Sequence, residues 1–149
     1  MSEIKGIELI EEQVKQATGF GPSNVSIANW KILSSGNDDH YAIIRPGPTE
    51  RPPLSFSVVD NNYRTIIEVW QRYRDDGGTV TDLLEYVDNI TAQIDRYRKL
   101  ADTTNTIRDA NVIEYGEVMQ KWNKDGGLSW LERDITVLWT EEESITYAE

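Results

Sequence analysis

Apolar residues recur at three- and four-residue steps in two stretches of the chain, which is the spacing of one helical face. The first stretch covers residues 3–18 and ends before Gly19, Gly21 and Pro22. Its repeating apolar positions are Ile4, Ile7, Ile10, Val14 and Ala17. The second stretch, residues 79–102, has a longer stripe made of Leu83, Val87, Ile90, Ile94, Tyr97 and Ala101. The pattern predicts two amphipathic helices.

Alternating apolar and polar positions, rich in β-branched and aromatic side chains, predict strands elsewhere in the chain. The segments are 41–44, 54–59, 110–122 and 128–142, and residues 30–33 are also expected to be extended. The last two segments flank NKDGG (123–127), which is typical of a hairpin loop. In the final strand Leu131, Ile135, Val137 and Trp139 share one face, which we therefore expect to lie on the core.

The stretch IIEVWQRYR (66–74) fits either a helix or a strand. Its periodicity slightly favours a helix, in which Ile66, Ile67, Trp70 and Tyr73 would share a stripe. Its context favours a strand, because DNN (60–62) precedes it as a turn sequence and DDGG (75–78) ends it. We therefore predict a strand that pairs with 54–59 through a hairpin turn at 60–62.

The predicted element order is α-β-β-β-α-β-β within a single domain, residues 1–149. Strands joined by short turns predict an α+β fold, with an antiparallel sheet of four to five strands covered on one face by two helices. PGPTERPP (46–53) is dense in proline, which fixes φ and lacks an amide donor, so we expect a loop outside the sheet. Residues 143–149 are expected to form a frayed or partner-bound tail.

Charge and composition narrow the function classes. The chain has 15 lysine and arginine residues against 26 aspartate and glutamate residues, a formal net charge of −11. This balance disfavours a nucleic-acid reader, because phosphate binding depends on clustered cations. It fits an ordinary solvated surface, or a surface past which DNA moves without binding. There is no cysteine and no apolar run near the ~18 residues of a membrane span, so we expect a soluble chain from a reducing compartment.

Candidate chemistry is sparse. The single histidine, His40, follows Asp38 and Asp39, but three consecutive residues rarely point at one ion. The acidic pair Asp75–Asp76 and the run at 141–143 are typical of solvated strand ends. No nucleophile elbow, zinc-protease, phosphate-loop or dinucleotide motif is present. We therefore expect no catalytic residues, no metal and no cofactor.

Five tryptophans are many for 149 residues, and most are expected in the core or in cross-strand pairs. A tryptophan on the sheet face without helices would instead mark an interface, where aromatic anchors are enriched. Trp70, together with Arg72, is the candidate for a contact between subunits.

The first helix, the YAIIRPG strand with its proline segment, IIEVWQRYRDD, the long helix and WLERDITVLWTEE together resemble the tail terminator family of long-tailed bacteriophages. The resemblance spans nearly the whole chain. It concerns the order of the elements and the kinds of residue in each segment. It implies a ring, typically of six copies, that sits on the tail tube, stops polymerisation of the tube protein and docks to the head-tail connector. DNA would pass through the ring without specific binding. The protein would belong to the neck of the virion, which is assembled in the host cytoplasm. A membrane is not among the expected partners.

The resemblance also suggests roles for loops. The predicted contact to a neighbouring ring is made by Arg45, Pro46, Thr49, Glu50 and Arg51. The predicted acids of the lumen are Asp38, Asp39, Asp75 and Asp76.

Two other functions fit the same sequence. Another phage neck component, such as a head-completion or tail-completion protein, would also be small, acidic and ring-forming. A monomeric α+β ligand-binding domain or small enzyme would instead have a concave pocket with convergent polar groups.

Overall fold

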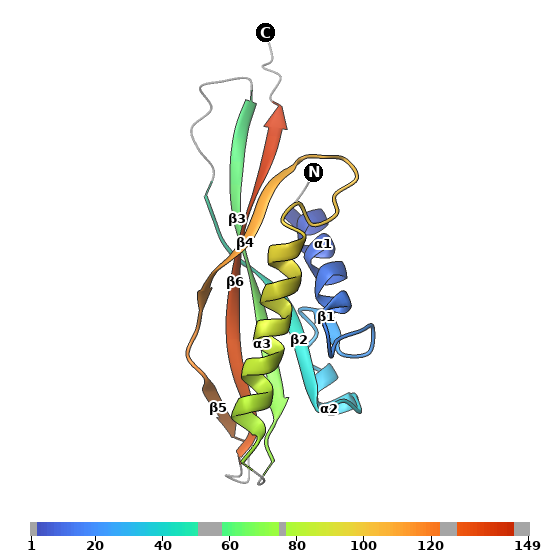
Figure 1. Ribbon diagram of the computed structural model, residues 1–149, viewed down its shortest axis with the longest axis vertical. Coiled ribbons are helices and arrows are strands. Elements are labelled where there is room, and N and C mark those ends of the chain that lie inside the picture. Colours follow the sequence, from blue (N-terminus) through green and yellow to red (C-terminus); the bar gives the residue numbers. More distant parts are fainter. Residues whose placement is uncertain (1–2, 51–57, 75–76, 123–127, 145–149) are drawn as a thin grey trace.

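The computed structural model describes residues 3–50, 58–74, 77–122 and 128–144. The fold is α+β, with a six-stranded mixed sheet and three helices in the described residues (Figure 1). In chain order the elements are α1 (Glu3–Gln16), β1 (Val25–Ile27), α2 (Ile32–Ser35), β2 (His40–Glu50), β3 (Val58–Arg72), α3 (Thr79–Arg96), β4 (Ile107–Tyr115), β5 (Met119–Trp122) and β6 (Leu128–Ser144). The α+β class is confirmed, and the sheet is larger than the predicted four to five strands.

The strand order is β1-β2-β3-β6-β4, and β5 pairs with the first part of β6. Every described pair is antiparallel except β1 with β2, which run parallel. Because β3 occupies the other side of β6, β4 and β5 follow one another along the same sheet edge. The opposite edge is formed by β1 and by the part of β2 that extends beyond it.

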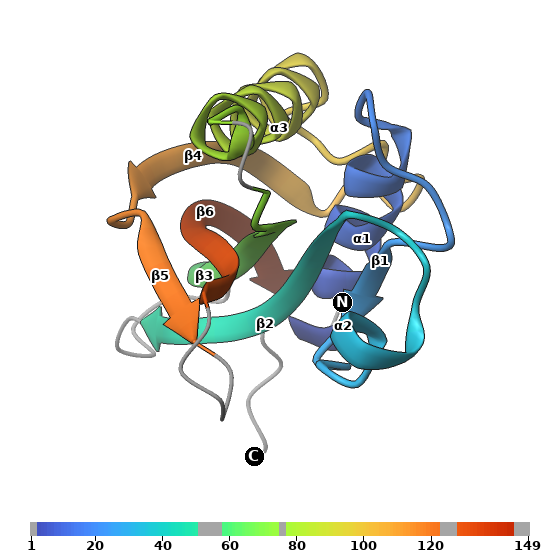
Figure 2. The ribbon, with the colours of Figure 1, turned by 90° about the horizontal axis from the view of Figure 1, so that it is seen from below.

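The main core lies between the sheet and the two long helices, α1 and α3, which pack on the same face (Figure 2). The predicted helical stripes supply much of it: Ile7, Ile10, Val14, Leu83, Val87, Ile90 and Ile94 are all buried. The predicted core face of β6 is also confirmed, since Leu131, Ile135, Val137 and Trp139 are buried.

Trp139 joins this core to α1. Its Nε1–H donates to Thr65 Oγ1 at 2.9 Å, so the buried indole has a hydrogen-bond partner. Its ring lies against the Cα of Gly6, where a Cβ would overlap the indole carbons. Glycine at position 6 therefore lets α1 approach β6 closely.

Residues 66–72 form a strand, as predicted, but the hairpin turn at 60–62 is wrong. Asp60, Asn61 and Asn62 continue β3 and pair with Glu142, Glu141 and Thr140 of β6. The long ladder with β6 satisfies their backbone groups, and Thr140 Oγ1 donates to Asn62 Oδ1 at 2.8 Å. The partners of 66–72 are therefore β2 and β6, and not residues 58–59 of the same strand. Residues 54–57 lie outside the described residues.

The prediction of a loop at 46–53 is wrong for its first half. Arg45, Pro46, Thr49 and Glu50 belong to β2 and pair with β3, with a register shift between Pro46 and Thr49. β1 pairs with β2 only at 42–44, so the prolines fall on an edge strand and beside a bulge, where a missing N–H is tolerated. Arg51 lies outside the described residues, as do residues 52–53.

The extended segment expected at 30–33 is also wrong. Trp30 and Lys31 begin a turn that leads into α2. The carbonyl of Lys31 accepts hydrogen bonds from the Ser35 N–H and from the hydroxyls of Ser34 and Ser35, which compete with strand pairing. Following this short helix, Gly36 packs on the hydroxyl of the buried Tyr41 side chain, on the sheet face opposite α1 and α3.

Candidate functional site

The sheet face opposite α1 and α3, here called the second face, holds a group of buried charges. Strand alternation places Arg45 of β2, Glu68 of β3, and Glu132 and Asp134 of β6 on this face. The register sets Glu68 beside Asp134, and Trp70 beside Glu132. We call Glu68, Glu132, Asp134 and Arg45 the acidic cluster.

Glu68 is the best-satisfied member of the acidic cluster, although only 8% of it is exposed. Arg45 Nε donates to its Oε2 at 2.6 Å. The indole N–H groups of Trp30 and Trp70 donate to its Oε1 at 2.7 and 3.1 Å. Arg45 Nη2 also donates to Asp134 Oδ2 at 3.2 Å, so one guanidinium bridges two carboxylates from adjacent strands.

Glu132 is 6% exposed, and its pKa is raised from 4.5 to about 8, mainly by burial. A hydrogen bond with Asp134 and the charges of Asp134 and Glu68 contribute to this rise, while Lys121 opposes it. Within the described part of the chain, Glu132 Oε2 and Asp134 Oδ1 are buried without a hydrogen-bond donor. A proton on Glu132 makes its carboxyl a hydrogen-bond donor to Asp134. At neutral pH the acidic cluster therefore contains a protonated glutamate.

Aromatic rings surround the acidic cluster. Trp70 and Trp130 meet edge to face with centroids 6.3 Å apart. The Arg72 guanidinium lies 4.5 Å from the centre of the Trp130 ring, and the Lys121 ammonium lies 5.8 Å from that of Trp70. Trp70 and Arg72 are thus on the second face and half-buried, and their contact with another subunit stays a prediction.

The other predicted site residues are dispersed. Arg45 belongs to the acidic cluster, where it donates to Glu68. Thr49 Oγ1 instead donates to Glu3 Oε1 of α1 at 3.2 Å. The backbone N–H of Asp38 donates to the Tyr41 hydroxyl at 2.9 Å. The carboxylate of Asp39 lies 3.7 Å from Arg72 Nε, so one predicted lumen acid has a cationic neighbour. Asp75 and Asp76 lie outside the described residues.

His40 is held by packing. Its ring stacks on Tyr86 with centroids 3.9 Å apart and meets Phe20 edge to face. Its Nε2 lies 3.3 Å from Asn24 Nδ2 and also contacts the Gly19 carbonyl. Among the residues that the structure describes, no group of three or more His, Cys, Asp or Glu side chains is arranged to hold a metal ion.

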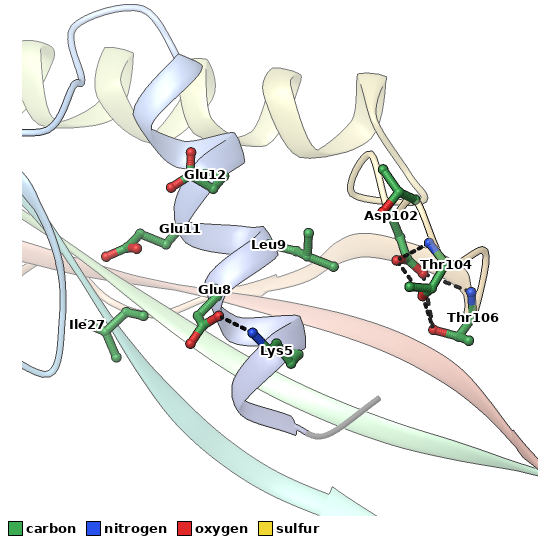
Figure 3. A pocket seen from close by; sticks show the side chains of 10 residues that line it. Lys5, Glu8, Leu9, Glu11, Glu12, Ile27, Asp102, Thr104 and Thr106 are labelled. Atoms are coloured by element: carbon green, nitrogen blue, oxygen red, sulfur yellow. Dashed lines mark hydrogen bonds and ion pairs between the residues drawn. The ribbon is translucent and has the colours of Figure 1, made fainter.

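A hollow of about 750 Å³ opens between α1, β1 and the loop after α3 (Figure 3). Leu9 and Ile27 give it apolar surface, and Glu8, Glu11 and Glu12 line its α1 side. Asp102, at its other side, is already engaged by its own loop. Burial opposes the ionisation of Asp102, but hydrogen bonds from the Thr104 hydroxyl and from three backbone N–H groups outweigh it and lower the pKa to about 2.

Sequence reasoning missed Glu68, Glu132 and Asp134. The available signal was a set of charged residues inside strands that are otherwise apolar or aromatic. Only the register between β3 and β6 shows that these charges meet.

Comparison of the chain with models of known protein families and with curated proteins gives no match. Within the described residues, no helix is long and apolar enough to cross a lipid bilayer.

Proposed function

We propose that this protein is a structural component of a bacteriophage tail that closes the tail tube as a homo-oligomeric ring. In this role it stops polymerisation of the tube protein and provides the docking surface for the head-tail connector. The observation that carries the proposal is the long ribbon formed by β3 and β6, which extends past the helix layer (Figure 1). All fifteen residues of β3 pair with β6.

The ribbon gives the molecule two different kinds of surface. Its outer part, Val58–Asn61 with Glu141–Ser144, lies beyond the last pairing of β2, at Glu50 with Asn62. The broader body below it contains α1, α3 and the remaining strands (Figure 1). When such bodies associate side by side, their ribbons project together at one end of the ring. A polymer cap needs two unlike ends. One end must bind the growing tube, and the other must not offer a new binding site for the tube protein.

The charge distribution is consistent with this role. The sequence of the outer ribbon contains Asp60 and the run Glu141–Glu143; Glu141 is buried, and Glu142 forms an ion pair with Arg108 at 2.9 Å. The net charge of −11 disfavours adhesion of DNA to a ring through which it slides. Asp38, Asp39, Asp75 and Asp76 stay the predicted acids of the lumen.

The decisive experiment is polymerisation of the cognate tube protein with and without this chain, followed by electron microscopy. We expect shorter tubes that bear an added ring at one end. Unchanged tube lengths and bare tube ends would refute the proposed function. Charge reversal at Glu142, as Glu142→Lys, tests the ribbon directly, and Glu114→Lys, at an exposed position of β4, is the matched control.

Both rival functions predict unchanged tube lengths, and each predicts a different partner. A different neck component would bind the connector and leave tube length unchanged. A monomeric ligand-binding domain would place a small molecule in the hollow beside α1. Because Asp102 is already engaged by hydrogen bonds from its own loop, a ligand in this hollow would depend on Lys5, Glu8, Glu11 and Glu12 for charged contacts.

A further inference from the structure

Exposed apolar side chains gather at the end of the molecule opposite the projecting ribbon. They come from the end of β3, the first two turns of α3 and the region of β5, which lie together at the lower end of Figure 1. We call these residues the apolar patch: Tyr73, Val80, Leu84, Val118, Met119 and Trp122. Their exposed fractions run from 37% to 60%, with Trp122 the most exposed. A hollow of about 520 Å³ lies among them and reaches down to Leu131.

The apolar patch adjoins an open strand edge. β5 pairs with β6 on one side, and no described strand pairs with its other side. The edge at β2 contains Pro46 and Pro48, which block further strand pairing, whereas β5 contains no proline. An open strand edge beside exposed aromatic, methionine and aliphatic side chains is a favourable place for another chain to bind.

The size of the apolar patch matches the centre of a stable interface. Six large side chains exposed to this degree present roughly 500 Å² of apolar surface, near the upper end for a single monomer. A standard interface buries about 800 Å² on each partner, and its centre is the most apolar part. The apolar patch therefore supplies most of what one side of a standard interface requires.

We propose that the apolar patch binds a second copy of this chain, at the hollow beside α1. This inference rests on the proposed ring and identifies its subunit contact. A closed ring needs a contact between two different surfaces of the same molecule. Seen along the long axis, β5 lies on one side of the molecule, and α1 and β1 lie on the other (Figure 2). Trp122 is 60% exposed, and the hollow offers it the apolar side chains of Leu9 and Ile27, which lie among Lys5, Glu8, Glu11 and Glu12.

The absence of cysteine from the chain allows a clean cross-linking test. Gln120→Cys places a thiol beside the apolar patch, and Glu12→Cys places one at the hollow; both positions are exposed. We expect disulfide-linked dimers when the two variants are mixed and oxidised, and little dimer from either variant alone. A dimer that forms equally well from Gln120→Cys alone would overturn the head-to-tail contact, and so would a mixture without dimers.

The mass of the protein in solution provides an independent measurement. We expect wild-type oligomers in sedimentation experiments at up to about 1 mM protein, a concentration at which even weak association is detected. Trp122→Asp and Val80→Asp should lower the association constant at least about tenfold, because each puts a charge into the apolar contact. Val80 lies in the first turn of α3, where an acidic side chain favours the helix, so this variant should fold.

Ile113→Asp is the matched control, because Ile113 is 43% exposed, close to the 48% of Val80, and belongs to neither surface. It should leave the association constant unchanged. A wild-type chain that stays monomeric throughout, or a Trp122→Asp variant that associates normally, would overturn the contact. These measurements need no tube protein, so association without any effect on tube length would refute the proposed function and leave the contact intact.

Discussion

Glu132 makes the stability of the fold depend on pH in a direction that is unusual for a carboxylic acid. Its pKa is raised from 4.5 to about 8, mainly by burial. Below pH 4.5 the side chain is neutral in both the folded and the unfolded chain, so it does not make the free energy of unfolding depend on pH. Between pH 4.5 and about 8 the unfolded chain releases this proton and the folded chain keeps it. The free energy of unfolding therefore falls as the pH rises through this window.

The substitution Glu132→Gln removes this dependence and keeps the shape of the side chain. The glutamine amide also donates a hydrogen bond, so it can replace the protonated carboxyl beside Asp134. One pKa unit corresponds to about 1.4 kcal/mol, so the variant should gain up to about 4–5 kcal/mol on the wild type between pH 4.5 and 8. The other members of the acidic cluster, Glu68, Asp134 and Arg45, are present in both chains, so the comparison isolates Glu132.

Urea unfolding of both chains at several pH values measures the difference. The gain of Glu132→Gln should be near zero at pH 4, grow through pH 6 and level off above about pH 8. Glu117→Gln removes a carboxylate from an exposed position between β4 and β5 and is the control. Two parallel curves for Glu132→Gln and wild type would refute the assignment of a proton to Glu132.

Three further predictions concern single contacts. Gly6→Ala should destabilise the fold by about 2–3 kcal/mol in urea unfolding, because its Cβ overlaps the Trp139 ring, whereas Gly21→Ala, in open space, should be near neutral. Trp70→Phe should cost about 1–2 kcal/mol, measured by thermal unfolding, because it removes one of two indole donors to Glu68 while Trp30 keeps the other. The lowered pKa of Asp102 stabilises the fold above pH 3.8, and this contribution is lost as the pH falls towards 2; Asp102→Ala should therefore cost about 1–2 kcal/mol at pH 7 and almost nothing at pH 2.

The parts of the fold that depend on local pattern were predictable. The apolar stripes of α1 and α3 follow helical periodicity, and the core positions of β6 follow strand alternation, so both could be found without knowing their partners. The strand at 66–72 was predictable from its β-branched and aromatic content and from the glycines after it. In each case a short window of sequence contains the information.

The errors arose where a distant partner decides the structure. Asn61 and Asn62 favour turns in isolation, but pairing with β6 keeps them extended. Pro46 disfavours a strand, but an edge position with a bulge accepts it. The acidic cluster depends on the same distant pairing, because Glu68 meets Asp134 only when β3 and β6 are aligned. Periodicity within one segment contains no information about that alignment.

The position of β6 at the centre of the sheet has a consequence for biosynthesis. β6 pairs with β3, β4 and β5, yet it is the last of these strands to leave the ribosome. Until residues 128–144 emerge, β3 has only β2 beside it, and β4 and β5 lack their partner strand. Completion of the sheet must therefore follow synthesis of this last strand, and a nascent chain shortened before residue 128 leaves apolar strands open to aggregation.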